Sequence, residues 1–453
     1  MTYIGTVQYW VSVLIAVYGA ALFVASPICG FLADRTSSRR LPLLWGLIAL
    51  AASTVILNVG SSVAVLIVGR ILQGLSAAVV WVVGLALLVD TVGAGGIGEA
   101  VGWIALSMTM GLMLGPLLGG VVYQRAGYNA VFAMAYTLIG IDIILRLMLI
   151  EQKVALRWIE RKDGKKEAVQ LENRDSKDPQ EQCKPKPAVG TEGADEGISQ
   201  GIAPSATTLQ GAVAVHPPVP KQKAIFDRLP PVITLLASRR MLAAVWGIMA
   251  QASLLTAFDA TLPLFVAQTF GWDSVGAGLL FLTIVIPSFV SPVVGKLSDK
   301  YGPRIPAAFG FLFSAPFLVL LRFVDHNSLR QKVLLCALLS MVGFALATCL
   351  PPLTAEISYL VEAKERRSPG RFGANGAMAQ AYGLFNMAFA AGCAIGPIWG
   401  GMVLEKAGWP TMGWSLALFS GVSVIPVAIW CGGSIFKKRR RADEEETGNV
   451  GNV

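Results

Sequence analysis

The chain has 453 residues, of which 54% are hydrophobic and 14% are charged, and its formal net charge is +9. A soluble domain carries about 25% charged residues, so this composition excludes an ordinary soluble protein and predicts a membrane protein. The basic excess does not indicate a nucleic-acid partner, because the lysines and arginines lie in loops beside apolar segments, where they set orientation in a bilayer.

Eleven apolar segments follow one another, each about 20 residues or longer, the length that a helix needs to cross a hydrocarbon core of about 30 Å. We place them at about 9–33, 42–60, 64–89, 101–122, 130–150, 242–268, 276–298, 305–324, 333–361, 377–403 and 412–434. The segments are continuously apolar and do not alternate between two faces, so the strands of a barrel are not expected. The sequence therefore predicts an all-α membrane protein.

These segments divide the chain into four parts. Residues 1–150 are expected to form a bundle of about five spans, and residues 241–435 a second bundle of six. Residues 151–240 are rich in charged residues, Gly, Ala, Thr and Pro, and such a segment cannot bury enough apolar surface to fold alone. We therefore expect a disordered cytoplasmic linker there, and a charged cytoplasmic tail at residues 436–453.

Basic residues predict the orientation. Arg39 and Arg40 follow the first span, Arg304 follows the seventh, and the run from Lys437 to Arg441 follows the last. All of these positions fall on one side of the bilayer if the spans alternate, and the positive-inside rule makes that side cytoplasmic. The C-terminus is then cytoplasmic. The protein is expected in the plasma membrane or in a vesicle or vacuole membrane.

A loop motif follows the first span and consists of Gly30, Asp34, Arg35 and Arg39. Gly30 lets a neighbouring helix approach closely, and Asp34 can accept hydrogen bonds from the exposed N–H groups of an adjacent helix start. The arginines can pair with Asp34 or with a carboxylate on the next helix. We predict that this cluster holds a cytoplasmic gate shut. The alternative is that these charges only fix topology.

The same motif recurs after the seventh span as Gly295, Asp299 and Arg304, with Pro303 as its main departure. Two spans of the second half precede this copy, whereas only one span precedes the first copy. We therefore expect a twelfth span before the first, and a truncated or misannotated start at Met1 explains its absence better than a genuine eleven-span protein.

Arg70 and Gln73 in the third span share one helix face, because they are three residues apart. An arginine near the centre of a membrane helix costs about 2.5–3.5 kcal/mol on insertion scales. We expect Arg70 to face a cavity. The alternative is that its side chain extends to the outer interface.

A glycine–proline motif occurs twice, about 280 residues apart. Its glycines recur every four residues and form a stripe along one helix face, where backbones can meet closely, and each proline bends its helix. We predict hinge helices at the contact between the two halves, against the alternative of ordinary tight packing. The copies are Gly111, Gly115, Pro116 and Gly119, and Gly392, Gly396, Pro397 and Gly400.

Ionisable residues inside the spans are functional candidates by default. Asp259 in the sixth span is the strongest candidate for a carboxylate that binds a proton or substrate. Glu356 follows Pro351 and Pro352, which disrupt the ninth span, and is the second candidate. Asn386 places a polar group on the tenth span.

Together, the loop motif at 30–40, the arginine motif at 70–74 and the glycine–proline motifs resemble those of the major facilitator superfamily, in its twelve-span drug:proton antiporter branch. This resemblance implies two helix bundles related by a pseudo-two-fold axis, with eleven of twelve spans visible and the substrate between the bundles. It also implies that Arg70 tunes a nearby acid during proton transfer. Segments 357–362, 382–389 and 394–401 are similar to the vesicular amine transporters. Glu362 matches an acidic position of that group, and Asn386 stands where the group has an aspartate.

We therefore predict a secondary active transporter that couples protons to the efflux of a small, largely apolar organic molecule or drug by alternating access. No enzyme activity, cofactor or metal is expected, because two histidines and six cysteines show no metal spacing or catalytic constellation. The expected partners are the substrate, protons and the lipid bilayer, around a monomer. The alternative is a non-transporting membrane sensor or an inactive truncated relic, which an upstream in-frame exon encoding an apolar span would exclude.

Overall fold

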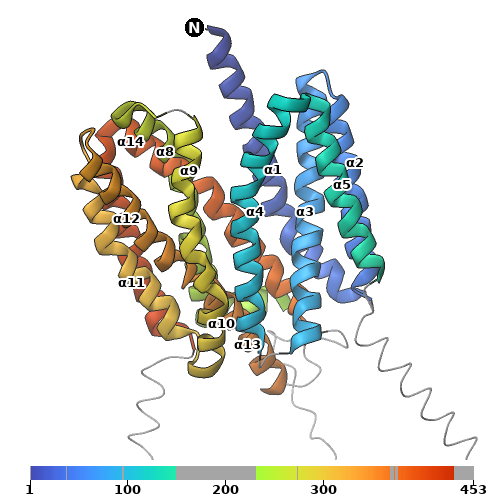
Figure 1. The fold of residues 1–453 in the computed structure, drawn as a ribbon. Helices are drawn as coiled ribbons and strands as arrows, with labels where there is room; N and C mark the ends of the chain where they lie inside the picture. Colours follow the sequence, from blue (N-terminus) through green and yellow to red (C-terminus); the bar gives the residue numbers. More distant parts are fainter. Residues whose placement is uncertain are drawn as a thin grey trace, which may run out of the picture. The chain divides into compact units, whose positions relative to one another are not determined.

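The computed structural model describes residues 2–36, 38–93, 96–148, 231–272, 274–367, 372 and 376–432. Every regular element within these ranges is a helix (Figure 1). Nine helices of the described part are long and apolar enough to cross a membrane. The helix that carries the first glycine–proline motif is not among the nine, and the last of the nine, Met378–Trp430, covers two of the expected spans. The count of eleven spans is therefore approximately matched.

The first half consists of α1 (Thr2–Arg35), α2 (Arg40–Val59), α3 (Val63–Val92), α4 (Ile97–Ala126) and α5 (Tyr128–Met148). Helix α3 packs against both α1 and α2, and α5 packs against α2 and α4. The Ser62 side chain caps α3 by accepting a hydrogen bond from the Val65 N–H, which satisfies a backbone donor of the first turn. Gly127, with φ of 81°, ends α4 in a conformation that favours glycine.

The second half begins with the short helix α7 and ends with the long helix α14. Its elements are α7 (Pro231–Leu236), α8 (Arg239–Phe270), α9 (Ser274–Val285), η3 (Ile286–Val290), α10 (Ser291–Tyr301), α11 (Arg304–Leu320), η4 (Leu321–Phe323), α12 (Leu329–Ala347), α13 (Leu350–Arg367) and α14 (Met378–Trp430). Gly408, with φ of 79°, breaks α14 into two helical stretches, which correspond to the last two expected spans.

Prolines explain two further departures from the expected spans. The segment 276–298 is not one helix, because Pro287 opens the short 3-10 turn η3 between α9 and α10. The segment 333–361 divides into α12 and α13. Pro351 and Pro352 lie in the first turn of α13, where a missing N–H removes no hydrogen bond of the helix.

The expected linker at residues 151–240 reaches into the described helices. Residues 151–230 lie outside the described residues, as does the expected tail at 436–453, whereas residues 231–240 contain α7 and the first two residues of α8. Leu235 of α7 is fully buried, and Lys364 of α13 donates a hydrogen bond of 2.6 Å to the Thr234 carbonyl. The last residues of the expected linker are therefore helical and packed.

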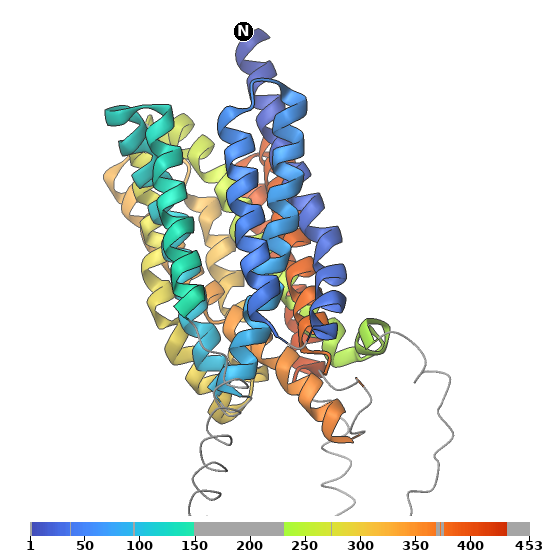
Figure 2. The same cartoon turned by 90° about the vertical axis from the view of Figure 1, so that its right-hand side faces the viewer.

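The two halves meet mainly through α1 with α14 and through α4 with α10 (Figure 2). Helices α1 and α10 carry the two copies of the loop motif, and α4 and α14 carry the two copies of the glycine–proline motif. Each loop-motif helix thus packs against the glycine–proline helix of the opposite half. This pairing is the pseudo-two-fold relation that the repeated motifs predict.

Candidate functional site

The side chain of Asp34, at the end of α1, lies against the first turn of α14 in the other half. Its Oδ1 accepts a hydrogen bond of 3.0 Å from the Ala379 N–H, and its Oδ2 accepts one of 2.9 Å from the Gln380 N–H. The carboxylate is buried. The first N–H groups of a helix have no partner within the helix and carry partial positive charge, so a carboxylate there makes charge-assisted hydrogen bonds.

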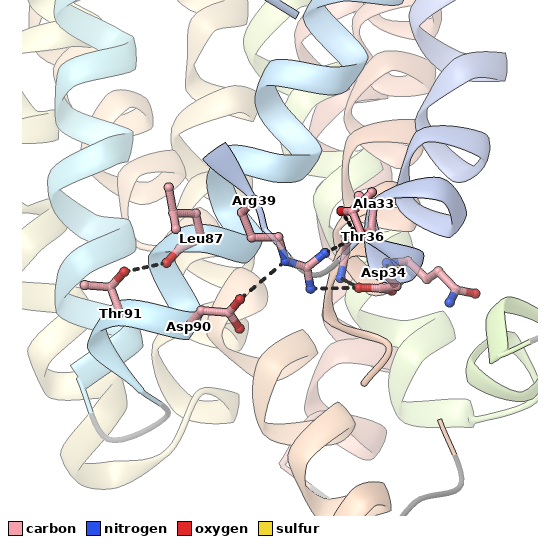
Figure 3. A network of polar contacts seen from close by, with 9 residues as sticks. Ala33, Asp34, Thr36, Arg39, Leu87, Asp90 and Thr91 are labelled. Atoms are coloured by element: carbon pink, nitrogen blue, oxygen red, sulfur yellow. Dashed lines mark hydrogen bonds and ion pairs between the residues drawn. The ribbon is translucent and has the colours of Figure 1, made fainter. Parts of the chain in front are cut away.

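Arg39 connects this carboxylate to a second acid. Its Nη2 lies 3.0 Å from Asp34 Oδ1, its Nε lies 3.4 Å from Asp90 Oδ2, and its Nη1 donates to the Ala33 carbonyl at 2.7 Å. Figure 3 shows the guanidinium between the two carboxylates. Arg35 does not take part, because its guanidinium lies over the Phe31 ring at 4.1 Å from the centroid. Arg39 therefore ties the end of α1 to the end of α3.

Asp299 makes the equivalent contact from the second half. Its Oδ1 accepts from the Gly98 N–H at 2.8 Å, and its Oδ2 accepts from the Glu99 N–H at 3.0 Å, in the first turn of α4. The third donor is the Tyr359 hydroxyl at 2.5 Å, in place of an arginine. Arg304 instead donates from Nε to the Cys431 carbonyl at 2.6 Å, because Pro303 starts α11 immediately and carries Arg304 away in its first turn.

Each loop-motif glycine lies one turn before its aspartate, at the closest approach of the two halves. A Cβ at Gly30 would lie 2.5 Å from the Ala379 carbonyl oxygen, and a Cβ at Gly295 would overlap the Gly98 carbonyl. Any side chain at either position would push the helix start away from the aspartate. We use the name "latches" for these two contacts: latch 1 is Asp34 on α14, and latch 2 is Asp299 on α4.

Arg70 and Gln73 lie together on α3, where Arg70 Nη1 donates to Gln73 Oε1 at 2.9 Å. Both line a cavity of about 400 Å³, together with Tyr18 of α1 and Trp81 of α3. Tyr18 is close enough to Cys393 of α14 to interact with it electrostatically. All of the residues that line the cavity belong to α1, α2 and α3 of the first half.

The two candidate carboxylates of the second half differ in their surroundings. Asp259 of α8 is solvent-accessible and has no hydrogen bond or salt bridge to any described residue. Glu356 is 1% exposed, and its Oε1 accepts from Arg240 Nε at 2.7 Å and from the Gly432 N–H at 2.8 Å. Glu356 thus joins the start of α8 to the end of α14, and of the two only Asp259 is open to a ligand.

Glu362 and Asn386 also have different surroundings. Glu362, near the end of α13, pairs with Arg366 at 2.5 Å. Asn386 of α14 is buried and donates from Nδ2 to Ser26 Oγ of α1 at 2.8 Å. Asn386 is therefore part of the contact between the halves.

The two glycine–proline stripes differ in their neighbours. Cβ atoms at Gly392 and Gly396 would overlap the carbonyls of Met249 and Ser253 on α8, which belongs to the same half. The stripe on α4, including Gly115, has no atom of a described residue within 4 Å of any such Cβ. The stripe of Gly392 and Gly396 therefore faces α8 of its own half and not the contact between the halves. The stripe of Gly111, Gly115 and Gly119 meets no described atom, and its role as a hinge surface stays a prediction. Gly400 packs on α8 as well.

Small residues that the sequence analysis did not select make further close contacts between the halves. Cβ atoms at Gly98 and Gly102 of α4 would lie 2.5 Å from the carbonyls of Gly295 and Ser291, respectively. A Cβ at Gly383 of α14 would lie 2.6 Å from the Ser26 carbonyl. The four-residue spacing of Gly98 and Gly102 is the signal that could have identified the first pair.

A sequence profile of the Major Facilitator Superfamily matches residues 3–377. The chain belongs to this superfamily. It is similar to an uncharacterized MFS-type transporter of Schizosaccharomyces pombe, with 32% identity over 402 residues that cover 88% of this chain and 81% of that protein. Among solved structures, the human organic anion transporter TETRAN matches with a TM-score of 0.62 at 17% identity and covers 91% of this chain and 83% of its own. The predicted family and fold are thereby confirmed.

Two further similarities concern the predicted branch. The class B tetracycline resistance protein of Escherichia coli is 24% identical over 340 residues, which cover 74% of this chain and 68% of that protein. The vesicular acetylcholine transporter of Tetronarce californica is 32% identical over 141 residues, which cover 31% of this chain and 27% of that protein. This superfamily member is therefore a multi-pass membrane protein of a transporter family, similar to both drug-resistance and vesicular proteins.

Proposed function

We propose that the chain is a secondary active transporter that exports a small, largely apolar organic molecule in exchange for protons. Its two halves rock about a central site and expose that site to each side of the membrane in turn. The two latches carry this proposal. Both cross between the halves, and each consists of an aspartate from one half on the first N–H groups of a helix from the other.

Such contacts suit a gate that opens and closes. Each aspartate is held by charge-assisted hydrogen bonds, which contribute about 1.5–3 kcal/mol each and which water can replace when the halves separate. The glycines beside Asp34 and Asp299 allow the backbones to meet without interlocking side chains. The latched state is therefore stable without being permanent, as alternating access requires.

Asp259 is the proposed proton-binding group. It lies within a membrane helix, where an ionisable residue is costly and commonly functional, and it has no partner among the described residues that would compete with a proton. Cys393 of α14 is near enough to interact with it electrostatically. A change of charge at Asp259 would therefore act on α14, the helix whose first turn forms part of latch 1.

The export of small organic molecules is supported by two relatives. The class B tetracycline resistance protein is similar over 74% of this chain, and the solved structure with the same fold is that of an organic anion transporter. We further propose a monomer in the plasma membrane or a vesicle or vacuole membrane with the C-terminus cytoplasmic, in keeping with the basic residues of the latch loops. Protease accessibility of a C-terminal epitope in sealed cells tests this orientation.

The test uses proteoliposomes with an imposed pH gradient and two probes, tetracycline and the anionic aromatic dye carboxyfluorescein. The wild-type protein should accumulate at least one probe when the gradient is present and should stop when an ionophore abolishes it. Asp259→Asn should remove this coupling, whereas the matched control Asp325→Asn, an exposed loop acid beside His326, should not. Gradient-driven transport that is unchanged in Asp259→Asn would contradict the assignment of this residue, and no gradient-driven movement of either probe would contradict proton-coupled drug export.

A further inference from the structure

The cavity among the first three helices contains one cation and no visible counter-ion. It measures about 400 Å³ and is lined by Tyr18 of α1, by Leu50 of α2, and by residues of α3 that include Arg70 and Trp81. No Asp or Glu is among its lining residues. An arginine inside a membrane span is costly, so its lack of a carboxylate partner calls for an explanation.

The hydrogen bonds of Arg70 leave most of its donors free. A guanidinium has five N–H groups. One Nη1–H goes to Gln73 Oε1 at 2.9 Å, and Nε is shielded from solvent without an acceptor. No carboxylate of a described residue lies within 4.0 Å of Arg70.

The acids of the first half that form salt bridges serve other arginines. Asp34 and Asp90 pair with Arg39, and Asp142 pairs with Arg146. None of these three carboxylates is therefore a partner of Arg70, and its remaining N–H groups are free of them. These N–H groups are available to an acceptor that no described residue supplies.

The helix packing fixes Arg70 at the edge of the cavity. Gly74 follows Arg70 by one turn, and a Cβ there would lie 2.6 Å from the Tyr18 carbonyl oxygen. Because Gly74 has no side chain, α1 comes close to α3 at this point. Tyr18 of α1 therefore lies near the Arg70 guanidinium at the cavity wall. Gln73 holds one edge of the guanidinium and limits its rotation.

The rest of the cavity wall is apolar. Along α3, the lining continues from Arg70 through Ala77 and Val80 to Trp81. Eleven residues of helix separate Arg70 from Trp81, which corresponds to about 16 Å at a rise of 1.5 Å per residue. The cavity thus has a cationic, hydrogen-bonding end and an elongated apolar end with an indole ring.

We propose that this cavity binds an amphipathic organic anion, with its carboxylate at Arg70 and its apolar or aromatic body along Ala77, Val80 and Trp81. A carboxylate has two oxygens that match the guanidinium N–H groups in a bidentate pair, and it supplies the charge that no described residue supplies. A cationic substrate is disfavoured, because Arg70 would repel it. A simple inorganic anion would leave the apolar end unfilled. The proposal rests on the proposed transport function and specifies the class of substrate that is transported.

The test compares three probes with the same aromatic body and different charge: naphthoate, naphthamide and naphthylmethylamine. Binding to the purified full-length protein in detergent is measured by isothermal titration calorimetry, which needs no ion gradient. A hydrogen-bonded charge pair contributes enough to change affinity by about ten- to a hundredfold. The wild-type protein should therefore bind naphthoate at least about tenfold more tightly than naphthamide, and naphthylmethylamine more weakly than both.

Arg70→Gln should lose this preference for naphthoate while it keeps the wild-type affinity for naphthamide, which also shows that the variant is folded. Arg70→Lys should keep part of the preference, since it keeps the charge but loses the planar fork. Arg146→Gln, which removes a surface salt bridge with Asp142, is the matched control and should bind as the wild type does. Equal affinity for the three probes, or an unchanged naphthoate affinity in Arg70→Gln, would overturn the proposal.

These outcomes are separable from those of the proposed function. Proton-driven transport without any preference for naphthoate would refute the anion site alone. An anion preference that depends on Arg70, in a protein that moves no probe under a pH gradient, would uphold the site and refute the transport proposal.

Discussion

Replacing Asp34 by asparagine should release latch 1 with little change of shape. Asp34 accepts three hydrogen bonds, from the N–H groups of Ala379 and Gln380 and from Arg39. Asparagine has one carbonyl oxygen, and its NH₂ group would face a donor. At least one charge-assisted bond is lost, worth about 1.5–3 kcal/mol. At 1.4 kcal/mol per factor of ten, the ratio of unlatched to latched molecules should rise about ten- to a hundredfold.

The assay for this shift is the rate of thiol labelling at the contact that the latch closes. Ser26 is fully buried between α1 and α14, so Ser26→Cys in a background without other cysteines reports on the separation of the halves. A membrane-impermeant maleimide should label this position faster in Asp34→Asn. Arg35→Gln is the control, because Arg35 is an exposed charge in the same loop that does not contact Asp34. Equal labelling rates in Asp34→Asn and the control would refute the reasoning.

Two further predictions concern the packing of the glycine stripes and the salt bridge between Arg240 and Glu356. Gly396→Ala should impair folding or expression, because its methyl group would overlap the backbone of α8, whereas the same change at Gly115 should be tolerated, since no described atom lies within 4 Å. Fluorescence-detected size-exclusion chromatography checks both, and equal losses would contradict the packing difference. Arg240→Met leaves the buried carboxylate of Glu356 without its cation. The free energy of unfolding should therefore fall by about 2 kcal/mol, and the melting temperature in detergent should fall with it. An unchanged melting temperature would argue against a structural role for this pair.

The sequence was sufficient to predict the local part of the latches. A glycine and an aspartate four residues apart lie on one helix face, so the pattern at Gly30 and Asp34 and its recurrence at Gly295 and Asp299 indicate two surfaces made for close contact. The groups that these surfaces meet are hundreds of residues away in the chain. A single sequence contains no signal for such a pairing, and the helix starts at Ala379 and Gly98 became evident only from the fold.

The predictions that failed or changed depended on which neighbour a helix face meets. The stripe at Gly396 has the spacing of a contact surface, and it is one, but its neighbour is α8 and not the other half. Glu356 has the signature of an intramembrane acid, yet Arg240 at the start of α8 reaches it. Arg304 occupies the position of Arg39 in its motif, but α11 begins there after Pro303, and Arg304 donates to the Cys431 carbonyl instead. Spacing defines a face, whereas tertiary packing selects its partner.

The pairing of Arg70 with Gln73 lies between these two cases. The spacing of three residues predicts the contact, and the structure has it at 2.9 Å. The cavity beside it required the approach of α1 at Gly74, which sequence alone does not indicate. Composition and hydropathy predicted the helical class of the protein, because satisfaction of backbone hydrogen bonds in lipid leaves few alternatives.

That the two halves are fastened at two separate points has a consequence for how they part. Asp34 and Asp299 share no ligand, yet each spans the same boundary. Two such contacts act together as a bivalent interaction. When one contact dissociates, the other keeps the separated groups at a high effective concentration, so the first contact re-forms faster than the halves separate. Brief failures at either point therefore rarely become a full separation of the two halves, which requires that both points release together.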